Sequence, residues 1–395
     1  MRNDDLGLSF DEGEGDGERG RHRRRPRAAG GGKTAIALIV VVAILGCGVG
    51  GVWFGFNKLS GLFDAPDYNS GGSGEVQVQI FEGQSATDIG AKLEELDVVK
   101  SQKAFVEAAK DNPRSKEIQP GVYKLRKQMR AADAVLLLLD RDQSRQLLKF
   151  TVPEGKTVID TLAIVAKATN LPLAEFQEAA KDPKALGVPD FWFNRPDKKE
   201  VKVSIEGFLY PQTYEFNPGV TPKEILTEMV THFLDVATKL KFVERVQAER
   251  KISPFEALIV ASLSQAEAGV PGDLGKVSRV AYNRVYKKNM PLEMDVTANY
   301  WLQLNGKQPK ESGKLTASEL DDKSSPYNTK SRLGLPVGPI NNPGEAALQG
   351  AMDPPVGEWL FFVAIDKAGN SAFAVTNEEH ERNIRQACAN GIALC

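Results

Sequence analysis

The chain has 395 residues, of which 42% are hydrophobic and 26% are charged, and its formal net charge is −2. These values lie in the ordinary globular range and exclude wholly disordered, collagen-like and multi-span membrane proteins. The balance of 50 Lys+Arg against 52 Asp+Glu provides no broad basic field, so we expect no nucleic-acid partner.

The N-terminal segment predicts a membrane anchor. Residues 1–33 carry acidic and then basic residues without apolar periodicity, which is typical of a disordered tail. Residues 34–56 form an uncharged apolar run long enough for one transmembrane helix. Because arginines precede this run, we expect a single-pass protein of the cell (inner) membrane, with its N-terminus cytoplasmic and its bulk, including any catalytic domain, extracytoplasmic.

Two other interpretations of this apolar run stay open. A cleaved secretory signal would have a shorter apolar stretch and a small-residue cleavage site. A lipoprotein signal would end its apolar stretch at Cys47, whereas the sequence stays apolar after it. Cys388 and Cys395 then form a candidate disulfide in the exported part. The three histidines belong to no HExxH or CxxC cluster, so we predict no metal and no cofactor.

The exported part has an expected α+β fold. Residues 57–74 are rich in turn-forming residues and predict a flexible linker. In residues 75–145 we predict a strand over 75–81, helices at 86–96 and around Phe105, and a returning strand over 121–125. This pattern resembles the LysM module, which binds glycans containing N-acetylglucosamine, although many small α+β units share it. Residues 146–204 predict a second small α+β subdomain.

Residues 205–395 carry the candidate chemistry. Ser253 and Pro254 predict a helix start, and apolar residues up to Ala266 then recur at helical spacing as a stripe on one face, until the helix stops near Gly269. Glu267 lies in the last turn of this helix, beside apolar residues and at the negative end of the helix dipole. Both effects raise the pKa of a carboxyl group, as a general acid requires. The competing interpretation is a half-exposed glutamate at a helix end. Gln265 points to the opposite edge of the helix, so the two residues cannot act as a pair.

The next predicted helix, residues 274–287, places Arg284 in an apolar stripe and Asn283 beside that stripe. A guanidinium in this position requires a carboxylate or polar partner. Alternatively, the stem of the side chain packs while its charged head reaches solvent.

Six motifs in a fixed order carry a family resemblance. They are Ala261–Glu267, Tyr282–Val285, Leu292–Thr297, Tyr327–Thr329, Gly334–Gly344 and Phe361–Val363. From about residue 75 to about residue 386 the chain resembles the YceG-like endolytic murein transglycosylases, the MltG family. The resemblance implies a membrane enzyme that cuts peptidoglycan glycan strands within the chain, and a C-terminal mixed α+β catalytic domain over 205–395.

The resemblance also implies a set of site residues. Glu267 corresponds to the catalytic acid. The implied substrate-binding residues are Asn283, Arg284, Asp295, Thr297, Tyr327, Asn328, Thr329 and Pro336. Asp295 can instead be a turn-capping residue, and the Gly- and Pro-rich stretch an ordinary structural loop. Two positions differ from the family's usual pattern: Gln265 replaces a glutamate, and Ser371 replaces a histidine.

The expected reaction is non-hydrolytic cleavage to a 1,6-anhydro sugar. Its partners would be peptidoglycan glycan strands and cell-wall synthases such as penicillin-binding proteins. One alternative is a hydrolytic muramidase that uses Glu267 with Asp295. Another is a non-catalytic scaffold that binds peptidoglycan and recruits synthases.

Overall fold

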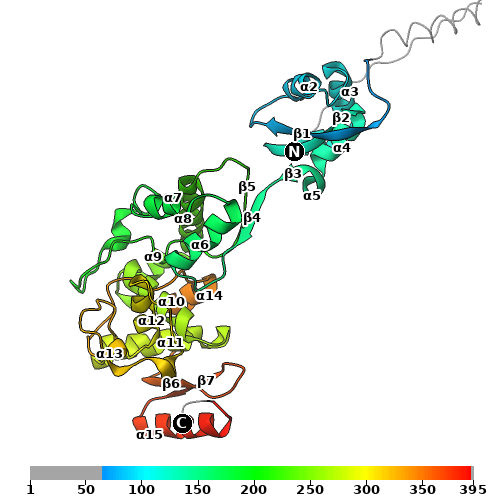
Figure 1. Cartoon of the computed structure of the whole chain (residues 1–395). Coiled ribbons are helices and arrows are strands. Elements are labelled where there is room, and N and C mark those ends of the chain that lie inside the picture. Colours follow the sequence, from blue (N-terminus) through cyan, green and yellow to red (C-terminus); the bar gives the residue numbers. More distant parts are fainter. Residues whose placement is uncertain (1–64, 393–395) are drawn as a thin grey trace, which may run out of the picture. The chain divides into compact units, whose positions relative to one another are not determined.

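The computed structural model of the protein describes residues 65–392 (Figure 1). The predicted cytoplasmic tail over 1–33 and the predicted membrane span over 34–56 lie outside this range. Among the residues inside it, no helix has the length and apolar character needed to span a bilayer. The membrane anchor therefore stays a prediction.

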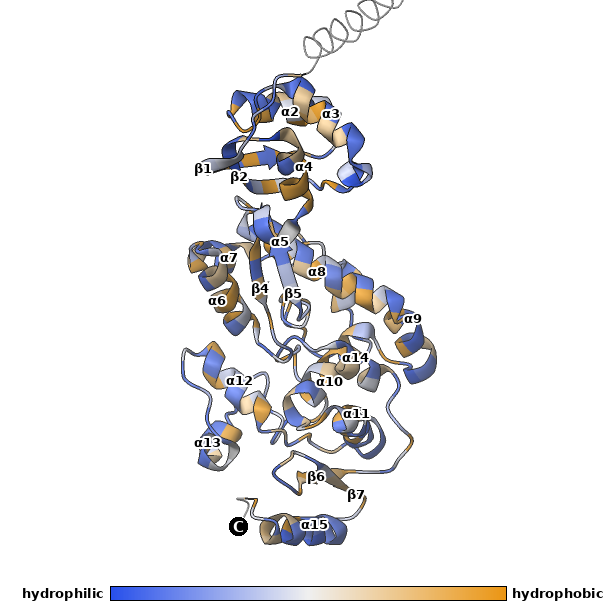
Figure 2. Cartoon of the chain, turned by 90° about the vertical axis from the view of Figure 1, so that its right-hand side faces the viewer, coloured by the Kyte–Doolittle hydropathy of each residue, from blue (hydrophilic) through white to orange (hydrophobic). Residues whose placement is uncertain are grey.

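The N-terminal unit is a small α+β assembly with its own core. Its elements are β1 (Gly71–Ile80), α2 (Ala86–Glu95), α3 (Gln102–Asp111), η1 (Pro113–Glu117), β2 (Gly121–Met129), α4 (Ala131–Leu139), α5 (Arg141–Ser144) and β3 (Arg145–Gln146). β1 pairs antiparallel with β2, and β3 adds to the free edge of β2. Phe105, Tyr123 and Leu138 are buried in the core, and Figure 2 shows the apolar residues along α4.

The predicted strands and helices of this unit are confirmed. The predicted linker over 57–74 is wrong at its C-terminal end, because the first strand begins before residue 74. β1 begins at Gly71, four residues inside the segment 57–74, and Gly71 pairs with Met129 of β2. Asp67 also accepts hydrogen bonds from the Ala131 amide at the start of α4. A Gly-rich sequence resembles a linker, yet here its backbone forms strand hydrogen bonds that no local signal predicts.

The next elements surround one continuous core. They are β4 (Leu148–Thr151), α6 (Val158–Thr169), α7 (Leu173–Ala179), η2 (Asp190–Phe193), β5 (Thr213–Phe216), α8 (Pro222–Lys239), α9 (Phe242–Arg245), η3 (Val246–Arg250), α10 (Pro254–Glu267), η4 (Pro271–Asp273), α11 (Leu274–Tyr282), η5 (Asn283–Lys288), α12 (Val296–Leu304), η6 (Ser312–Lys314), α13 (Ala317–Leu320) and α14 (Glu345–Met352).

The predicted second subdomain over 146–204 does not have a separate core. β4 pairs antiparallel with β5, which lies beyond the predicted boundary at 204. Trp192 is buried and its ring contacts those of Phe208 and Phe233. Buried residues from Phe150 to Met352 thus form one cluster. The segment is too short to bury its apolar faces alone, so it shares the core of residues 205–352.

Helix α10 lies at the centre of this core. Its predicted start is confirmed: Ser253 and Glu256 form a reciprocal capping box, and Pro254 occupies the first turn. The helix ends at Glu267, as predicted near Gly269. The predicted one-sided apolar stripe is wrong, because residues 254–264 are buried on all faces under α11, α12 and α14. Ala266, assigned to that stripe, is exposed.

Asn342 ties three segments of the core together and is itself fully buried. Its Oδ1 accepts hydrogen bonds from the Gly207 and Leu209 amides at 3.0 and 2.9 Å. Its Nδ2 donates to the Lys156 carbonyl at 2.9 Å and to Oε1 of Glu206 at 3.3 Å. Every polar atom of the side chain is therefore used, and its donor and acceptor ends cannot be exchanged.

We expect Asn342→Asp to destabilise the protein by about 3–5 kcal/mol, although the side chain keeps its shape. The new carboxylate would be buried, and one of its oxygens would face the Lys156 carbonyl, an acceptor that has no proton to donate. Urea unfolding would measure the change. Asn69→Asp, at an exposed position before β1, is the control and should change stability by only about 0.5 kcal/mol. Equal stability of the two variants would contradict the role of Asn342.

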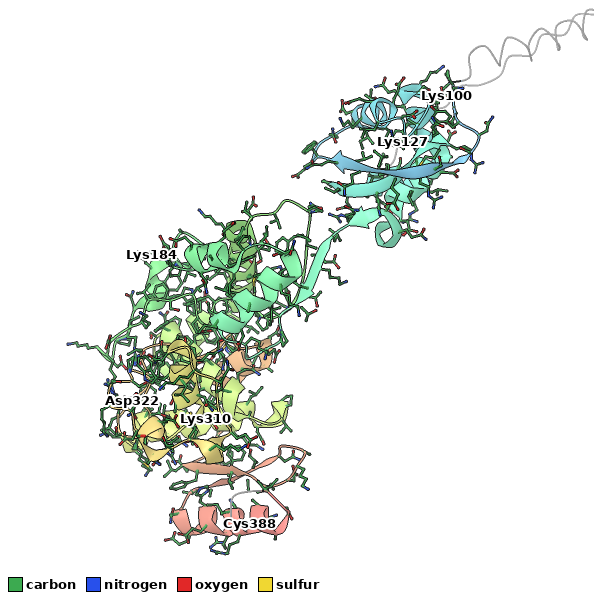
Figure 3. All side chains as sticks on the ribbon, in the orientation of Figure 1. Lys100, Lys127, Lys184, Lys310, Asp322 and Cys388 are labelled. Carbon is green, nitrogen blue, oxygen red and sulfur yellow. The ribbon has the colours of Figure 1, made fainter. Side chains whose placement is uncertain are left out.

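The C-terminal elements are β6 (Phe361–Ala364), β7 (Ser371–Ala374) and α15 (Asn377–Ala389). β6 and β7 form an antiparallel hairpin that lies between α11 and α15 (Figures 1 and 2). Gly269 and Gly369 bring the hairpin close to the end of α10, since a Cβ atom on Gly269 would lie 2.5 Å from the Gly369 carbonyl oxygen. Cys388 on α15 (Figure 3) is disulfide-bonded, and its predicted partner Cys395 lies outside the described residues.

Candidate active site

Glu267 lines a pocket of about 590 Å³ at the end of α10. The pocket is bounded by the start of α12, by η5 and the segment that follows it, and by the β6–β7 hairpin with α15. Oε1 of Glu267 is buried and has no hydrogen-bond partner among the described residues. A buried carboxyl oxygen without a donor favours the protonated form of the group.

Burial is the main cause that raises the pKa of Glu267, to about 7, and the negative charge of Asp295 raises it further. The backbone amide of Val296, in the first turn of α12, acts in the opposite direction. The predicted direction of the shift is therefore confirmed. At neutral pH a large share of these carboxyl groups holds a proton, and this is the state from which a general acid works.

Arg284 joins two walls of the pocket. Its Nε donates to the Leu360 carbonyl at 2.6 Å, next to β6. Its Nη1 donates to the Pro291 and Leu292 carbonyls and to Glu293 Oε2, all at 3.0 Å. Its side chain is only 8% exposed. The predicted polar partners of this guanidinium are thus present, and the alternative of a head group in solvent is excluded.

Asp295 lines the same pocket as Glu267 and Arg284. It occupies the N-cap position of α12, but its side chain makes no capping hydrogen bond, so the turn-capping interpretation does not apply. Burial raises the pKa of Asp295, Lys330 lowers it, and Glu293 raises it. Lys330 itself donates to Glu293 at 3.2 Å. The pocket therefore contains three carboxyl groups and two cations.

The other predicted site residues lie outside the lining of this pocket. They are Asn283, Thr297, Tyr327, Asn328, Thr329 and Pro336. All six are buried, and they make hydrogen bonds inside the protein or pack against its core. The sugar contacts predicted for them stay a prediction.

Four contacts show how these residues support the pocket. Oγ1 of Thr329 accepts a hydrogen bond from the Met294 amide at 3.1 Å and lies 3.0 Å from Oγ1 of Thr297. This contact fixes the segment that carries Glu293 and Asp295. Arg195, which sequence analysis did not single out, donates to the Pro336 carbonyl at 2.6 Å. Tyr327 packs edge-on against Tyr300 in the core.

The side chain of Asn328 closes a turn. Its Oδ1 accepts hydrogen bonds from the amides of Lys330 and Ser331, at 2.8 and 3.0 Å. Its Nδ2 donates to Asp321 and to the Asp322 carbonyl. The turn therefore presents Lys330 to the pocket.

His380 is a pocket residue that sequence analysis missed. Its ring stacks on Phe361, with centroids 5.2 Å apart, and its Nδ1 is buried without a partner among the described residues. Burial and the nearby Arg284 charge lower its pKa, so the imidazole is neutral at neutral pH. Ser371, the position where the resemblance led us to expect a histidine, also lines the pocket. Ser371 and His380 lie more than about a hundred positions after Glu267 in the chain, so only the tertiary fold brings them into the same pocket.

Gln265 lies outside the pocket lining, as its position on the helix predicts. Its Oε1 accepts a hydrogen bond from the Gly344 amide at 2.9 Å. Glu267 thus has no partner on its own helix, and the second carboxyl group of the site comes from Asp295.

The fold and the pocket define a mixed α+β protein with one buried, protonatable glutamate at the end of a central helix. Residues 78–386 match the YceG-like family. A protein of Bacillus subtilis named endolytic murein transglycosylase is 32% identical over 316 residues, 78% of this chain and 83% of that protein. One of the same name from Streptococcus pneumoniae is 26% identical over 352 residues, 85% of this chain and 62% of that protein.

A solved structure agrees with these sequence matches. The 2.6 Å crystal structure of a YceG-like protein of Listeria monocytogenes has 28% sequence identity and a TM-score of 0.52. The alignment covers 78% of this chain and 98% of that chain. The chain belongs to the YceG-like family.

Proposed function

We propose that this protein is an endolytic peptidoglycan lytic transglycosylase. It cleaves the bond between N-acetylmuramic acid and N-acetylglucosamine inside nascent glycan strands, leaves 1,6-anhydro ends, and so terminates strand polymerisation. The observation that carries this proposal is the buried Glu267 carboxyl, with its pKa of about 7, in a pocket of a YceG-like protein. Relatives that are named endolytic murein transglycosylases support it.

One carboxyl group is sufficient for this reaction. Glu267 donates its proton to the glycosidic oxygen while the bond from that oxygen to C1 of N-acetylmuramic acid breaks. The resulting carboxylate then takes the proton of the C6 hydroxyl of the same sugar, whose oxygen bonds to C1 and closes the anhydro ring. The proton given and the proton taken balance, and no water is consumed.

In this proposal Arg284, Asp295 and Lys330 act around the acid. Asp295 raises the pKa of Glu267 by its negative charge, so it keeps the acid protonated. Arg284 holds the segment of Glu293 against the segment that leads into β6. Lys330 and the neutral His380 face the pocket and provide hydrogen-bond donors or acceptors for sugar substituents.

Product analysis in oxygen-18-labelled water tests the reaction type. The purified full-length chain is incubated with uncrosslinked glycan strands, and the products are identified by mass spectrometry. We expect internal fragments with anhydro ends and no label from water. Reducing ends that carry the label would instead identify a hydrolytic muramidase. Binding of strands without cleavage would favour the non-catalytic scaffold.

The variant Asp295→Asn tests the role of the second carboxyl group. We expect it to remain active but to lose activity at lower pH than the parent, because removal of the Asp295 charge lowers the pKa of Glu267. At pH 8 its rate should therefore be severalfold below that of the parent, and near pH 5 the two rates should converge. Rate measurements from pH 5 to 9 would show the shift. A loss of about 100-fold or more at every pH would assign Asp295 a direct chemical role, as in a muramidase.

The location of the enzyme belongs to the same proposal. We propose that residues 34–56 cross the inner membrane once and that the catalytic region faces the cell wall, where nascent strands emerge. The LysM-like N-terminal unit would bind glycan, and cell-wall synthases would be the protein partners. This topology is tested by adding protease to intact spheroplasts. We expect the protease to digest the catalytic region and to leave the cytoplasmic tail intact.

A further inference from the structure

A second pocket, of about 410 Å³, lies at the other end of α10 from the candidate acid. Glu256 lines it, and Glu267 follows Glu256 by eleven positions of the helix, a rise of about 16 Å. Two π-helical turns contribute to its wall, η3 through Arg250 and η5 through Asn283. Such turns occur frequently at functional sites. The proposed transglycosylase reaction does not use this pocket.

Arg250 is the unexplained group in this pocket. Its side chain is only 23% exposed, and its Nε is buried with no hydrogen-bond partner among the described residues. Its nearest carboxylates, Glu249 and Asp353, both lie at 4.0 Å. Arg245 binds both carboxylates more closely, at 3.0 and 3.2 Å. A largely buried guanidinium without hydrogen bonds indicates an acceptor that comes from outside the chain.

The charge around Arg250 favours an anion. A second guanidinium, that of Arg279, lines the same pocket, and within residues 65–392 its hydrogen bonds go to two neutral carbonyls, those of Pro354 and Pro355. Burial and the charge of Arg250 both lower the pKa of Arg279, as expected for two close cations.

The acidic groups that line the pocket already have partners. Asp197 accepts two hydrogen bonds from Arg195. Glu256 accepts hydrogen bonds from Ser253 and from Tyr286. Glu249, the third carboxylate of the lining, accepts hydrogen bonds from Arg245. None of the three carboxylates is therefore free to neutralise the two guanidinium groups.

Asn283 supplies the complementary acceptor. It is 1% exposed and lines this pocket, and its Nδ2 is held by the Gly357 and Trp359 carbonyls at 3.0 and 2.9 Å. These two bonds fix the orientation of the amide. Its Oδ1 is buried and has no donor among the described residues. A ligand that satisfies the pocket therefore carries an anionic group together with an N–H or O–H donor.

We propose that this pocket binds the carboxy-terminal residue of a peptide. Such a residue combines a planar carboxylate, which matches the guanidinium of Arg250 and Arg279, with an adjacent amide N–H for Asn283. The rings of Tyr282 and Tyr286 provide an apolar wall for its side chain. This inference is independent of the proposed glycan cleavage.

Binding of N-acetyl-alanyl-alanine to the full-length chain tests the proposal. Calorimetry and saturation-transfer NMR should detect binding of the peptide with a free carboxylate. The same peptide with a C-terminal amide should bind with at least about tenfold lower affinity. Inorganic phosphate serves as the second probe. Phosphate lacks the N–H donor, so we expect it to bind more weakly than the peptide. Tighter binding of phosphate, equal binding of the amide, or no binding of the peptide at millimolar concentration would overturn the assignment.

Two matched variants locate the binding. Arg250→Gln should weaken peptide binding at least about tenfold, because it removes the charged donor. Lys288→Gln removes the same charge from an exposed position of η5 outside the pocket lining and should leave binding unchanged. Glu267→Gln should also bind the peptide normally, which separates this site from the proposed catalytic one. Unchanged binding by Arg250→Gln would refute the site. If that variant does not fold, the proposal is still tested on the parent chain, by comparing the affinities of the carboxylate and amide forms of the peptide.

Discussion

Replacing Glu267 by glutamine is expected to reduce glycan cleavage by about 10²- to 10⁴-fold, the usual contribution of a general acid. Glutamine keeps the shape of the side chain but cannot release a proton to the glycosidic oxygen. Anhydro-ended products should therefore disappear, whereas binding of the glycan strand should persist. Rates of product formation at pH 6 and a strand-binding assay would measure the two effects separately.

The same substitution has a predictable effect on stability. The folded-state pKa of Glu267, about 7, lies above the value of about 4.3 expected for an unfolded chain. Its contribution to stability is therefore fully present below about pH 4 and is lost as pH rises through 7. At pH 8 Glu267→Gln should be at least as stable as the parent. A large loss of stability at pH 8, or full retained activity, would contradict the assignment of Glu267 as a buried acid.

Glu378→Gln is the matched control for Glu267→Gln. Glu378 is exposed in the first turn of α15, outside the pocket lining. Its substitution should change neither the rate nor the pH profile. A parallel loss of activity in both variants would indicate a general effect of charge.

The second large effect is expected at Arg284. Arg284→Met keeps much of the volume of the side chain but removes four hydrogen bonds. Three backbone carbonyls and Glu293 lose their donor, which should cost about 3–5 kcal/mol of stability. The walls of the pocket would also lose their connection, so activity should fall under conditions where the variant is still folded. Chemical unfolding and rates on the folded fraction would separate the two losses.

Two further variants make this prediction specific. Arg284→Lys keeps the charge but cannot reach both Leu360 and Leu292 with separate donors, so it should recover only part of the lost stability. Arg382→Met removes an exposed arginine of α15 and should change stability by only about 0.5 kcal/mol. If Arg284→Met were as stable as Arg382→Met, the bridging role of Arg284 would be wrong.

Local signals predicted the elements that position the candidate acid. The Ser253–Glu256 capping box and the apolar spacing after it predicted the start and end of α10, and hence the place of Glu267 in its last turn. Those signals act within one or two helical turns, so they are visible in sequence. The ordered motifs added the family, which the match over residues 78–386 bears out.

Other properties depended on contacts between distant segments. A periodicity argument could not predict that α10 is buried on all faces, because its neighbours α11, α12 and α14 are separate elements. Nor could it place His380 of α15 in the pocket of Glu267, or assign Thr297 and Thr329 to each other. The same limit explains the early start of β1 at Gly71, since its partner strand lies some fifty residues later.

The sequence by itself determined which residues form the helix that ends in Glu267, the family of the chain, and the direction in which the pKa of that glutamate shifts. Each of these follows from neighbours in the chain or from ordered motifs. The tertiary structure alone decided which side chains share the pocket, that Asp295 raises the pKa of Glu267, and that Arg284 joins two walls. The physical reason is that burial and charge act through space, between residues that folding brings together.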